Sequence, residues 1–506
     1  MQRRIWRSQI FAGVFIVCPA KSHDFLLRQE LLKFSYRRYV LMERKNAWSK
    51  YTSEKDKKKV MAFAEDYRQF LSACKTEREC VSYFVEKAEK AGYINLEDAI
   101  SKGQKLKPGD KVYAANKGKM LAVFNIGKEP IEKGLNILGA HIDSPRMDLK
   151  QNPLYEDSDI ALFDTHYYGG IKKYQWVTIP LALHGVIVKK DGEIVNVNVG
   201  EDPADPVFGI SDLLIHLAAD QMDKKGSKVV EGEDLNVIVG SIPGFDKEGK
   251  KEKDAVKSNV LKLIKEKYDL EEEDFISAEI EVVPAGPARD FGFDRSMILG
   301  YGHDDRVCAY PSFMALINAK KTLDKTACAL LVDKEEIGSV GATGMQSKFF
   351  ENTLAEIYNL VGEYSELNLR RALSNSKVLS SDVSAALDPN YASAFEKNNS
   401  AYLGRGLVFN KYTGARGKSG SNDASAEYVG EIRAMMDKDN VFWQTAELGK
   451  VDQGGGGTIA YIMGNYNMQV IDSGVAVLSM HAPCEIISKV DLYEALLGYE
   501  AFIKYA

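Results

Sequence analysis

The chain has 506 residues, of which 45% are hydrophobic and 27% are charged, and these values exclude wholesale disorder and collagen-like structure. A formal net charge of −6 without a basic cluster argues against nucleic acid as a partner. Six cysteines with no Cys-x-x-Cys pair exclude a disulfide scaffold and favour a reducing, cytoplasmic location. No run of 18 apolar residues occurs, so we expect no membrane-spanning helix.

The N-terminal segment permits two readings. Basic MQRRIWR precedes a short apolar stretch at residues 10–17, which imitates a signal peptide but ends in a poor cleavage site. In the other reading Met42 is the working start, and residues 1–41 are an extension that does not belong to the working protein.

The elements expected along the chain change character twice. Residues 45–95 have apolar side chains at helical spacing, which predicts two helices. Short apolar runs between turns predict strands from residue 108 onward. Alternation in residues 176–200 around a Lys-Asp-Gly turn predicts a β-hairpin, and residues 212–222 read as a short helix. After residue 295, apolar strands alternate with helices, with strands expected at 327–333, 358–363, 377–384 and 474–485.

Alternating strands and helices indicate an α/β fold with a mixed, largely parallel sheet flanked by helices. The region around the predicted antiparallel hairpin separates two segments that we assign to this α/β fold. We therefore predict a catalytic domain formed by residues 42–153 and 291–506, interrupted by a smaller β-rich insertion at residues 154–290.

Metal-binding side chains follow the ends of the predicted strands. Such ends are where open α/β sheets bind ligands. The residues at these positions are His141 and Asp143, Asp304 and Asp305, Glu335 and Glu336, Asp382, and His481. Each alone is more often structural, but two imidazoles and several carboxylates together suit two divalent ions such as Zn²⁺ that share one carboxylate. Of the adjacent pair Glu335 and Glu336, one can bind metal while its neighbour accepts a proton from water.

These motifs resemble the M18 aspartyl aminopeptidase family of metallo-aminopeptidases. The resemblance rests on HIDSPR at 141–146, HDD at 303–305, DKEEIGS at 333–339, SDV at 381–383 with DPNY at 388–391, and MH at 480–481. It runs from about residue 45 to the C-terminus, and KYTGARGKSGSNDASAEY and AELGKVDQGGGGT are similar to the bacterial branch. It implies a zinc-peptidase-like fold whose insertion acts as a dimerisation or lid domain.

The resemblance assigns a role to each residue of the site. Asp304 would bridge two metal ions, with His141 and Asp382 completing one position and Glu336 and His481 the other. Glu335 would be the general base, and Asp143 would orient the imidazole of His141. Zn²⁺ is the expected metal, with Mn²⁺ or Co²⁺ as alternatives.

The resemblance also points to groups that would contact substrate. The candidates for binding an acidic side chain of the substrate are Lys411, Arg416 and Lys418. The candidate for binding the α-amino group is Asp452. The run Gly454–Gly457 lacks the Lys-Ser/Thr of a P-loop. It suits either a wall against which a peptide lies or a tight turn.

The function implied is removal of the N-terminal residue from peptides, with Asp or Glu as the residue suggested by the family. Two alternatives stay open: a metallo-amidohydrolase acting on N-acyl amino acids, and a non-catalytic assembly scaffold of the same fold. The resemblance further implies a homo-oligomer, a dodecamer built from dimers.

Overall fold

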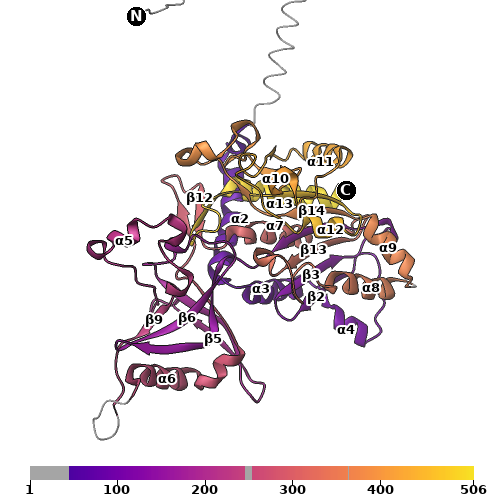
Figure 1. Ribbon diagram of the computed structural model, residues 1–506. Helices are drawn as coiled ribbons and strands as arrows, with labels where there is room; N and C mark the ends of the chain where they lie inside the picture. The colour runs from indigo at the N-terminus through magenta and orange to yellow at the C-terminus, as the bar shows by residue number, and fades with distance from the viewer. Residues whose placement is uncertain (1–44, 246–252, 363) are drawn as a thin grey trace, which may run out of the picture. The chain divides into compact units, whose positions relative to one another are not determined.

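A nine-stranded mixed sheet forms the centre of the chain (Figure 1). The computed structural model describes residues 45–245, 253–362 and 364–506. In spatial order the strands are β1 (Ile94–Asn95), β2 (Lys111–Asn116), β3 (Met120–Asn125), β13 (Ala327–Val332), β4 (Asn136–His141), β14 (Lys377–Ser381), β18 (Gln469–Gly474), β16 (Leu407–Asn410) and β17 (Trp443–Thr445). The core strands β13, β4, β14 and β18 are parallel, whereas β3 and β16 pair antiparallel beside them. The expected mixed, largely parallel α/β sheet is confirmed.

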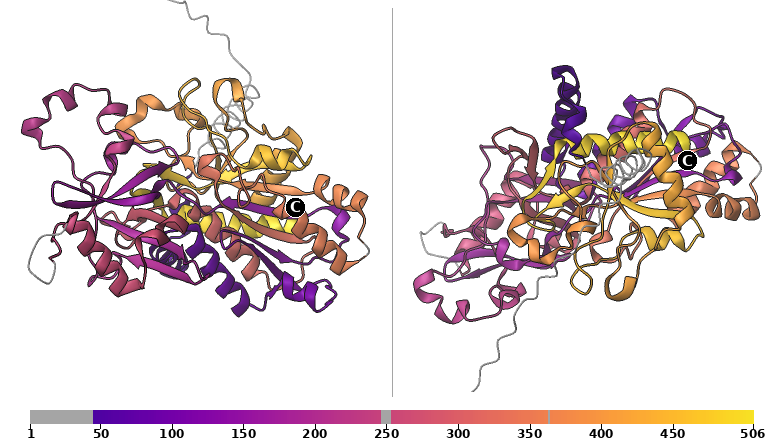
Figure 2. Two further views of the ribbon diagram at one scale, coloured as in Figure 1. Left: turned by 60° about the horizontal axis from the view of Figure 1, so that its bottom comes forward. Right: turned by 90° about the horizontal axis from the view of Figure 1, so that it is seen from above.

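Helices cover both faces of this sheet (Figure 2). One face packs against α2 (Glu54–Ala73), α3 (Glu77–Lys90), α7 (His303–Asn318), α11 (Ala426–Lys438) and α13 (Lys489–Tyr505). The other packs against α4 (Leu96–Ser101), α8 (Phe349–Val361), α9 (Glu366–Ser374) and α12 (Ala460–Gly464). In β3, Leu121 faces the first set and Ala122 the second, and every residue is buried, which explains why such strands read as continuous apolar runs.

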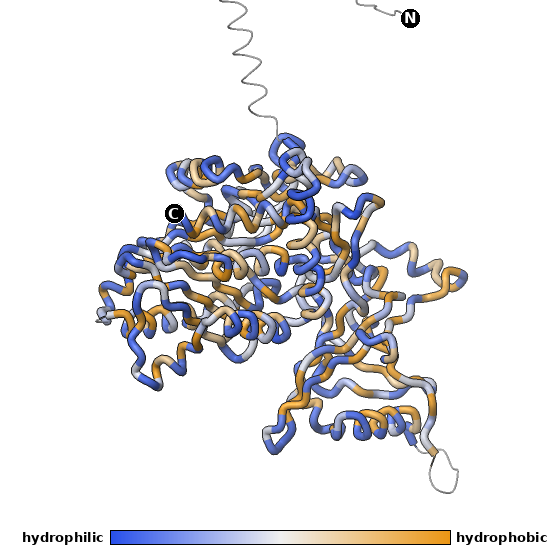
Figure 3. Tube along the Cα trace, turned by 180° about the vertical axis from the view of Figure 1, so that it is seen from behind, coloured by the Kyte–Doolittle hydropathy of each residue, from blue (hydrophilic) through white to orange (hydrophobic). Residues whose placement is uncertain are grey.

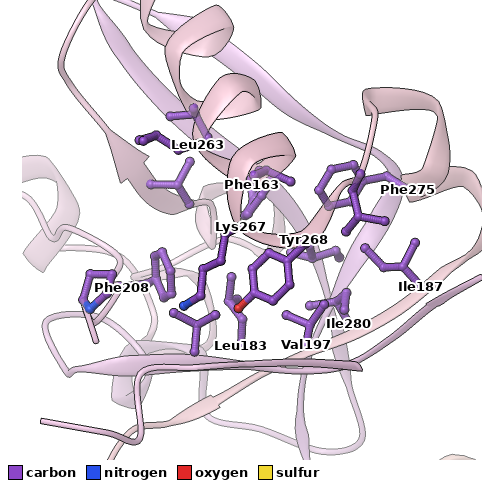
Figure 4. Close-up of a pocket in the computed structure, with 17 residues that line it drawn as sticks. Phe163, Leu183, Ile187, Val197, Phe208, Leu263, Lys267, Tyr268, Phe275 and Ile280 are labelled. Carbon is purple, nitrogen blue, oxygen red and sulfur yellow. The ribbon is translucent and has the colours of Figure 1, made fainter. Parts of the chain in front are cut away.

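A separate antiparallel sheet lies within residues 146–284, and the boundary expected at residue 154 falls inside one of its strands. The division of the chain into domains stays a prediction. The strands of this sheet, in spatial order, are β8 (Ile194–Val199), β7 (Leu181–Val188), β10 (Ala278–Pro284), β5 (Arg146–Asp157), β6 (Ile160–Tyr168) and β9 (Val237–Gly240). The hairpin expected within residues 176–200 is present as β7 and β8. Helix α6 (Ala255–Tyr268) covers this sheet, and a cavity of about 240 Å³ lies between them. Figure 4 shows its apolar lining, with Lys267 and Tyr268 as the polar side chains.

The chain also forms a smaller third sheet. Its strands are β11 (Arg289–Phe291), β12 (Met297–Gly300), β20 (Glu485–Ser488), β19 (Ala476–Leu478) and β15 (Ser384–Ala385). Two further short helices, α5 (Ala219–Met222) and α10 (Ala415–Lys418), lie in loops. Among the described residues, no helix has the length and apolar character needed to cross a membrane.

Three local expectations need correction, and a fourth lies outside the described residues. Residues 358–361 continue helix α8 rather than forming a strand, because Phe350, Leu354 and Ile357 place the apolar side chains at helical spacing and bury them. The strand expected at 474–485 is divided between β18, β19 and β20, in two sheets. The helix expected at 212–222 is reduced to two short turns. Residues 1–41 lie outside the described residues.

Candidate metal centre

The predicted metal-binding side chains meet at one point although they lie on five separate segments. His141 ends β4, Asp304 begins α7 after β12, and Asp382 follows β14. Glu336 lies in a single 3₁₀ turn after β13, and His481 lies between β19 and β20. His141, Asp304 and Glu336 offer ligand atoms within 4.8 Å of one another, as do His141, Glu335 and Asp382. The structure therefore brings all five predicted ligands together with Glu335.

Asp304 lies between the two imidazoles. Its Oδ1 is 3.1 Å from Nε2 of His141, and its Oδ2 is 3.2 Å from Nε2 of His481. Asp382 Oδ1 lies 4.0 Å from the first imidazole, and Glu336 Oε2 lies 3.7 Å from the second. A carboxylate flanked in this way suits the bridging role expected for Asp304.

The hydrogen-bond partner of Nδ1 in His141 and in His481 decides which nitrogen of a neutral imidazole carries the proton. Nδ1 of His141 lies 3.0 Å from the carbonyl of Asp143, and Nδ1 of His481 lies 2.8 Å from the carbonyl of Gly170. Because Nδ1 of each ring has an acceptor at hydrogen-bond distance, a neutral ring that donates there presents the lone pair of Nε2 toward Asp304. An imidazole nitrogen and a carboxylate oxygen about 3 Å apart share either a proton or a metal ion, so this donor set can hold a metal ion on each side of Asp304.

The neighbouring carboxylates shift the pKa values of the groups in this cluster. Burial lowers the pKa of His141, but the carboxylates of Asp143 and Asp304 outweigh it and hold the pKa well above its usual range. For Asp382, burial and the neighbouring charges of Asp304 and Glu335 raise the pKa. The pocket thus concentrates negative charge that a divalent cation would neutralise.

Asp143 holds two parts of the site together. Its carboxylate accepts the backbone N–H groups of Glu335 and Glu336, both at 3.2 Å, and Oδ1 lies 3.2 Å from Nδ1 of His141. Tyr168, at the end of β6, donates its hydroxyl to Oδ2 at 2.8 Å. Asp143 is completely buried, and its contacts reach both His141 and the turn that carries the two glutamates. Its role in orienting a metal-bound imidazole stays a prediction.

Glu485 makes an equivalent connection that the sequence did not reveal. Its two oxygens accept the backbone N–H groups of His481 at 2.8 Å and Asp304 at 3.0 Å. His481 has a left-handed backbone with φ of +63°, a conformation that costs energy in a residue with a Cβ. The contact from Glu485 stabilises that turn. In the sequence, the only indication of this role is that Glu485 follows His481 by four residues. A single acidic residue at such a position usually faces solvent.

A cavity of about 510 Å³ opens beside the cluster. Its lining comprises Gly170, Asp304, Glu335, Glu336, Gly338, Ser339, Asp382, Val383, Asn410, Thr413, Leu448, Gly455, Gly456, Gly457, Thr458, Tyr461, Asp472, Met480 and His481. Three of the four glycines at 454–457 therefore form part of its wall. At Gly455, whose φ is +120°, a Cβ would lie 2.6 Å from the backbone of Ala415, which explains the requirement for glycine.

The four residues expected to contact substrate lie apart from this cavity. Arg416, Lys418 and Asp452 line a neighbouring hollow of about 240 Å³. Lys411 and Lys418 both pair with Asp423, at 3.2 and 3.0 Å. Their roles toward substrate stay predictions.

Comparison with known proteins identifies the family. The model of the aminopeptidase I zinc metalloprotease family (M18) matches residues 70–503. The chain belongs to the M18 family. An M18 family aminopeptidase 1 of Clostridium acetobutylicum is 65% identical over 464 residues, covering 92% of this chain and 99% of that protein. A homologue in Thermotoga maritima is 46% identical over 464 residues, with the same two coverages.

Solved structures of M18 members share the fold. The crystal structure of aminopeptidase I from C. acetobutylicum has a TM-score of 0.84 at 64% identity, covering 91% of this chain and 99% of its own. An M18 aminopeptidase from T. maritima gives 0.86 at 45% identity, covering 92% and 100%. A Saccharomyces cerevisiae structure described as a dodecamer gives 0.70 at 20% identity, covering 88% and 96%. The expected family, α/β fold and metal-dependent aminopeptidase class are confirmed.

Proposed function

We propose that this M18 member removes the N-terminal residue of peptides at a centre of two divalent ions. Asp304 would bridge them, His141 and Asp382 would hold one, and Glu336 and His481 the other. The observation that carries this proposal is the placement of the Nε2 atoms of His141 and His481 against the two oxygens of the Asp304 carboxylate. Bound Zn²⁺, Mn²⁺ or Co²⁺ would polarise both water and the scissile carbonyl.

Glu335 supplies the proton transfers in this proposal. Its Oε2 lies 3.9 Å from Nε2 of His141, and the side chain lines the cavity. Burial, together with the charges of Asp143 and Asp304, raises the pKa of Glu335 to about 7. A carboxylate with this pKa can take a proton from the attacking water and return it to the leaving amine near neutral pH. Because Asp143 fixes its backbone, the side chain stays directed at the reacting groups.

The surplus of carboxylates favours a substrate that carries a free ammonium group. Among the residues that line the cavity, Asp304, Glu335, Glu336, Asp382 and Asp472 are acidic. An amidohydrolase for N-acyl amino acids would instead meet a substrate without that charge. A preference for N-terminal Asp or Glu, as the family suggested, would require one of the basic candidates to reach the cavity.

Assembly into a homo-oligomer, a dodecamer built from dimers, forms part of the proposal. Apolar side chains between 49% and 70% exposed lie on the projecting segment around α5, whose hydrophobic residues are visible in Figure 3. They are Val207, Leu213, Leu214, Ile215, Leu217 and Met222. A concentration of this kind is typical of a protein–protein interface. A cytoplasmic location also stays a proposal, which fractionation of cells would test.

The decisive experiment measures amino acid release from aminoacyl-p-nitroanilides. Enzyme stripped with chelator should be inactive and should regain activity with Zn²⁺, Mn²⁺ or Co²⁺. N-acetylated versions of the same substrates should not react. Release of acetate from the N-acetylated substrates, without hydrolysis of the unblocked ones, would favour the amidohydrolase. Equal, negligible turnover by wild type and Glu335→Gln would favour the scaffold.

A further inference from the structure

One tyrosine of the antiparallel sheet lies between a buried arginine and the metal cluster. Tyr168 ends β6 and is 8% exposed, and Arg146 begins β5 and is 5% exposed. The pairing of these strands, which are labelled side by side in Figure 1, places Arg146 directly opposite Tyr168. Cζ of Arg146 lies 3.9 Å from the centre of the tyrosine ring. A guanidinium this close to an aromatic face is attracted by the ring electrons, and more strongly where water is excluded.

The same tyrosine contacts Asp143 through its hydroxyl, which donates to Oδ2 at 2.8 Å. Burial and the negative charge of Asp143 raise the pKa of Tyr168 in spite of the opposing charge of Arg146, so the hydroxyl keeps its proton and acts as a donor. Asp143 precedes Arg146 by three residues. This short segment therefore holds the tyrosine both at its hydroxyl and at the face of its ring.

The backbone that follows Tyr168 reaches the other side of the cluster. The carbonyl of Gly170 lies 2.8 Å from Nδ1 of His481. At Gly169, whose φ is +76°, a Cβ would lie 3.2 Å from Oε2 of Glu336, so the chain passes close against that side chain. A displacement of Tyr168 would thus change the contacts of both imidazoles, those of His141 through Asp143 and those of His481 through Gly170.

Two buried carboxylates hold the guanidinium of Arg146 in place. Oε2 of Glu281, on β10, lies 3.1 Å from Nε, and Oε2 of Glu77, on α3, lies 3.6 Å from Nη1. Buried carboxylates of this kind require a cation beside them. Asp148 also lies 2.8 Å from Nε, but its side chain is 38% exposed, so water can replace that contact. The position of Arg146 is therefore set by α3 and by the antiparallel sheet together.

We propose that Arg146 is a positioning residue for the metal centre and that it acts through Tyr168. Its guanidinium holds the ring where the hydroxyl meets Asp143, and Asp143 in turn contacts His141 and the turn that carries both glutamates. Arg146 is not among the residues that line the cavity, so it acts without touching substrate. This inference rests on the proposed aminopeptidase function and adds to it a residue outside the cavity.

The test is a double-mutant cycle on Arg146→Lys and Tyr168→Phe. Lysine keeps a positive charge beside Glu77 and Glu281 but lacks the planar guanidinium, and phenylalanine keeps the ring but lacks the hydroxyl. For each metal-loaded enzyme, kcat and KM are measured with the aminoacyl-p-nitroanilide that wild type hydrolyses fastest. The affinity for Zn²⁺, measured by competition with a chromophoric chelator, provides a readout separate from turnover.

The expected results depend on which hydroxyl contact is present. Tyr168→Phe should lower kcat and Zn²⁺ affinity about tenfold, and Arg146→Lys should lower both about fivefold. In the Tyr168→Phe background, Arg146→Lys should change either quantity by less than about twofold, because the hydroxyl through which it acts is gone. An equal loss in both backgrounds would overturn the inference, since a merely structural role does not depend on the hydroxyl. Wild-type kcat and affinity in Arg146→Lys would also overturn it.

Arg78→Lys is the matched control. Arg78, on α3, donates from Nε to Glu279 on β10 at 2.9 Å, so it links the same helix to the same sheet through a different carboxylate. Its kcat and its Zn²⁺ affinity should equal those of wild type.

A second variant covers the case in which Arg146→Lys does not fold. Arg146→Met combined with Glu281→Gln removes two opposite buried charges together and avoids an uncompensated carboxylate. The same comparison, with and without the Tyr168 hydroxyl, then decides the inference. A metal-loaded wild type that hydrolysed none of the substrates would refute the aminopeptidase function, whereas the Zn²⁺ affinities would still decide the role of Arg146.

Discussion

Replacing Asp143 with asparagine tests how the metal site is held in shape. The carboxylate contacts Nδ1 of His141 and accepts the backbone N–H groups of Glu335 and Glu336 and the hydroxyl of Tyr168. Asparagine keeps the size but supplies one acceptor oxygen and one NH₂ donor in place of two acceptors. Whichever way the amide turns, a donor will face N–H or O–H groups on one side.

The expected loss of activity and of Zn²⁺ affinity in Asp143→Asn follows from these contacts. A hydrogen bond to a charged group contributes roughly 1.5–3 kcal/mol, and the substitution weakens at least one such bond to a group that carries a metal ligand or the general base. Loss of this size corresponds to about a 10–100-fold fall in metal affinity or activity, the range typical of residues that orient metal ligands. We therefore expect kcat/KM and Zn²⁺ affinity both to fall by about 10–100-fold.

The assay combines p-nitroanilide hydrolysis with Zn²⁺ affinity from competition with a chromophoric chelator. Asp148→Asn is the matched control, because Asp148 lies nearby on β5, accepts Nε of Arg146 at 2.8 Å and has a side chain that is 38% exposed. The control should stay within about threefold of wild type in both measurements. If Asp143→Asn also stayed within threefold, the positioning role would be refuted.

Two further predictions concern stability. In Gly474→Ala the new Cβ would lie 1.8 Å from the carbonyl oxygen of Asp382, so we expect a loss of roughly 1–3 kcal/mol in unfolding free energy. An unchanged urea midpoint would contradict this. Burial raises the pKa of Asp491 to about 7 although it accepts N–H groups from Gly404 and Gly406. The native state then binds more protons than the unfolded chain between about pH 4 and 7, so stability falls as pH rises through that window. Relative to Asp491→Asn, wild type should lose melting temperature from pH 5 to pH 8; a difference independent of pH would exclude this linkage.

Much of the fold was predictable because burial leaves a pattern in the chain. Apolar runs marked β4 and β13, and alternation around a turn marked the hairpin β7–β8. The failure at residues 358–363 has a physical reason: a short apolar run has the same composition in a buried strand and on the buried face of a helix. Here Leu354 and Ile357 extend that face backward and favour helix α8.

The candidate metal ligands and Asp143 could be picked out from the sequence, whereas Tyr168 and Glu485, which hold them in place, could not. Imidazole and carboxylate side chains at successive strand ends indicate metal chemistry directly. Tyr168 and Glu485 act through bonds to Asp143 and to backbone N–H groups, and such partners depend on how distant loops meet.

The central claim is that Glu335 transfers the proton at a centre that the other five residues build. Its most direct test is the kcat of Glu335→Gln measured on a sample whose metal content is determined by mass spectrometry. The account predicts two divalent ions per subunit, as in wild type, and a fall in kcat of at least roughly 100-fold. A fully loaded Glu335→Gln enzyme with kcat within threefold of wild type would contradict it.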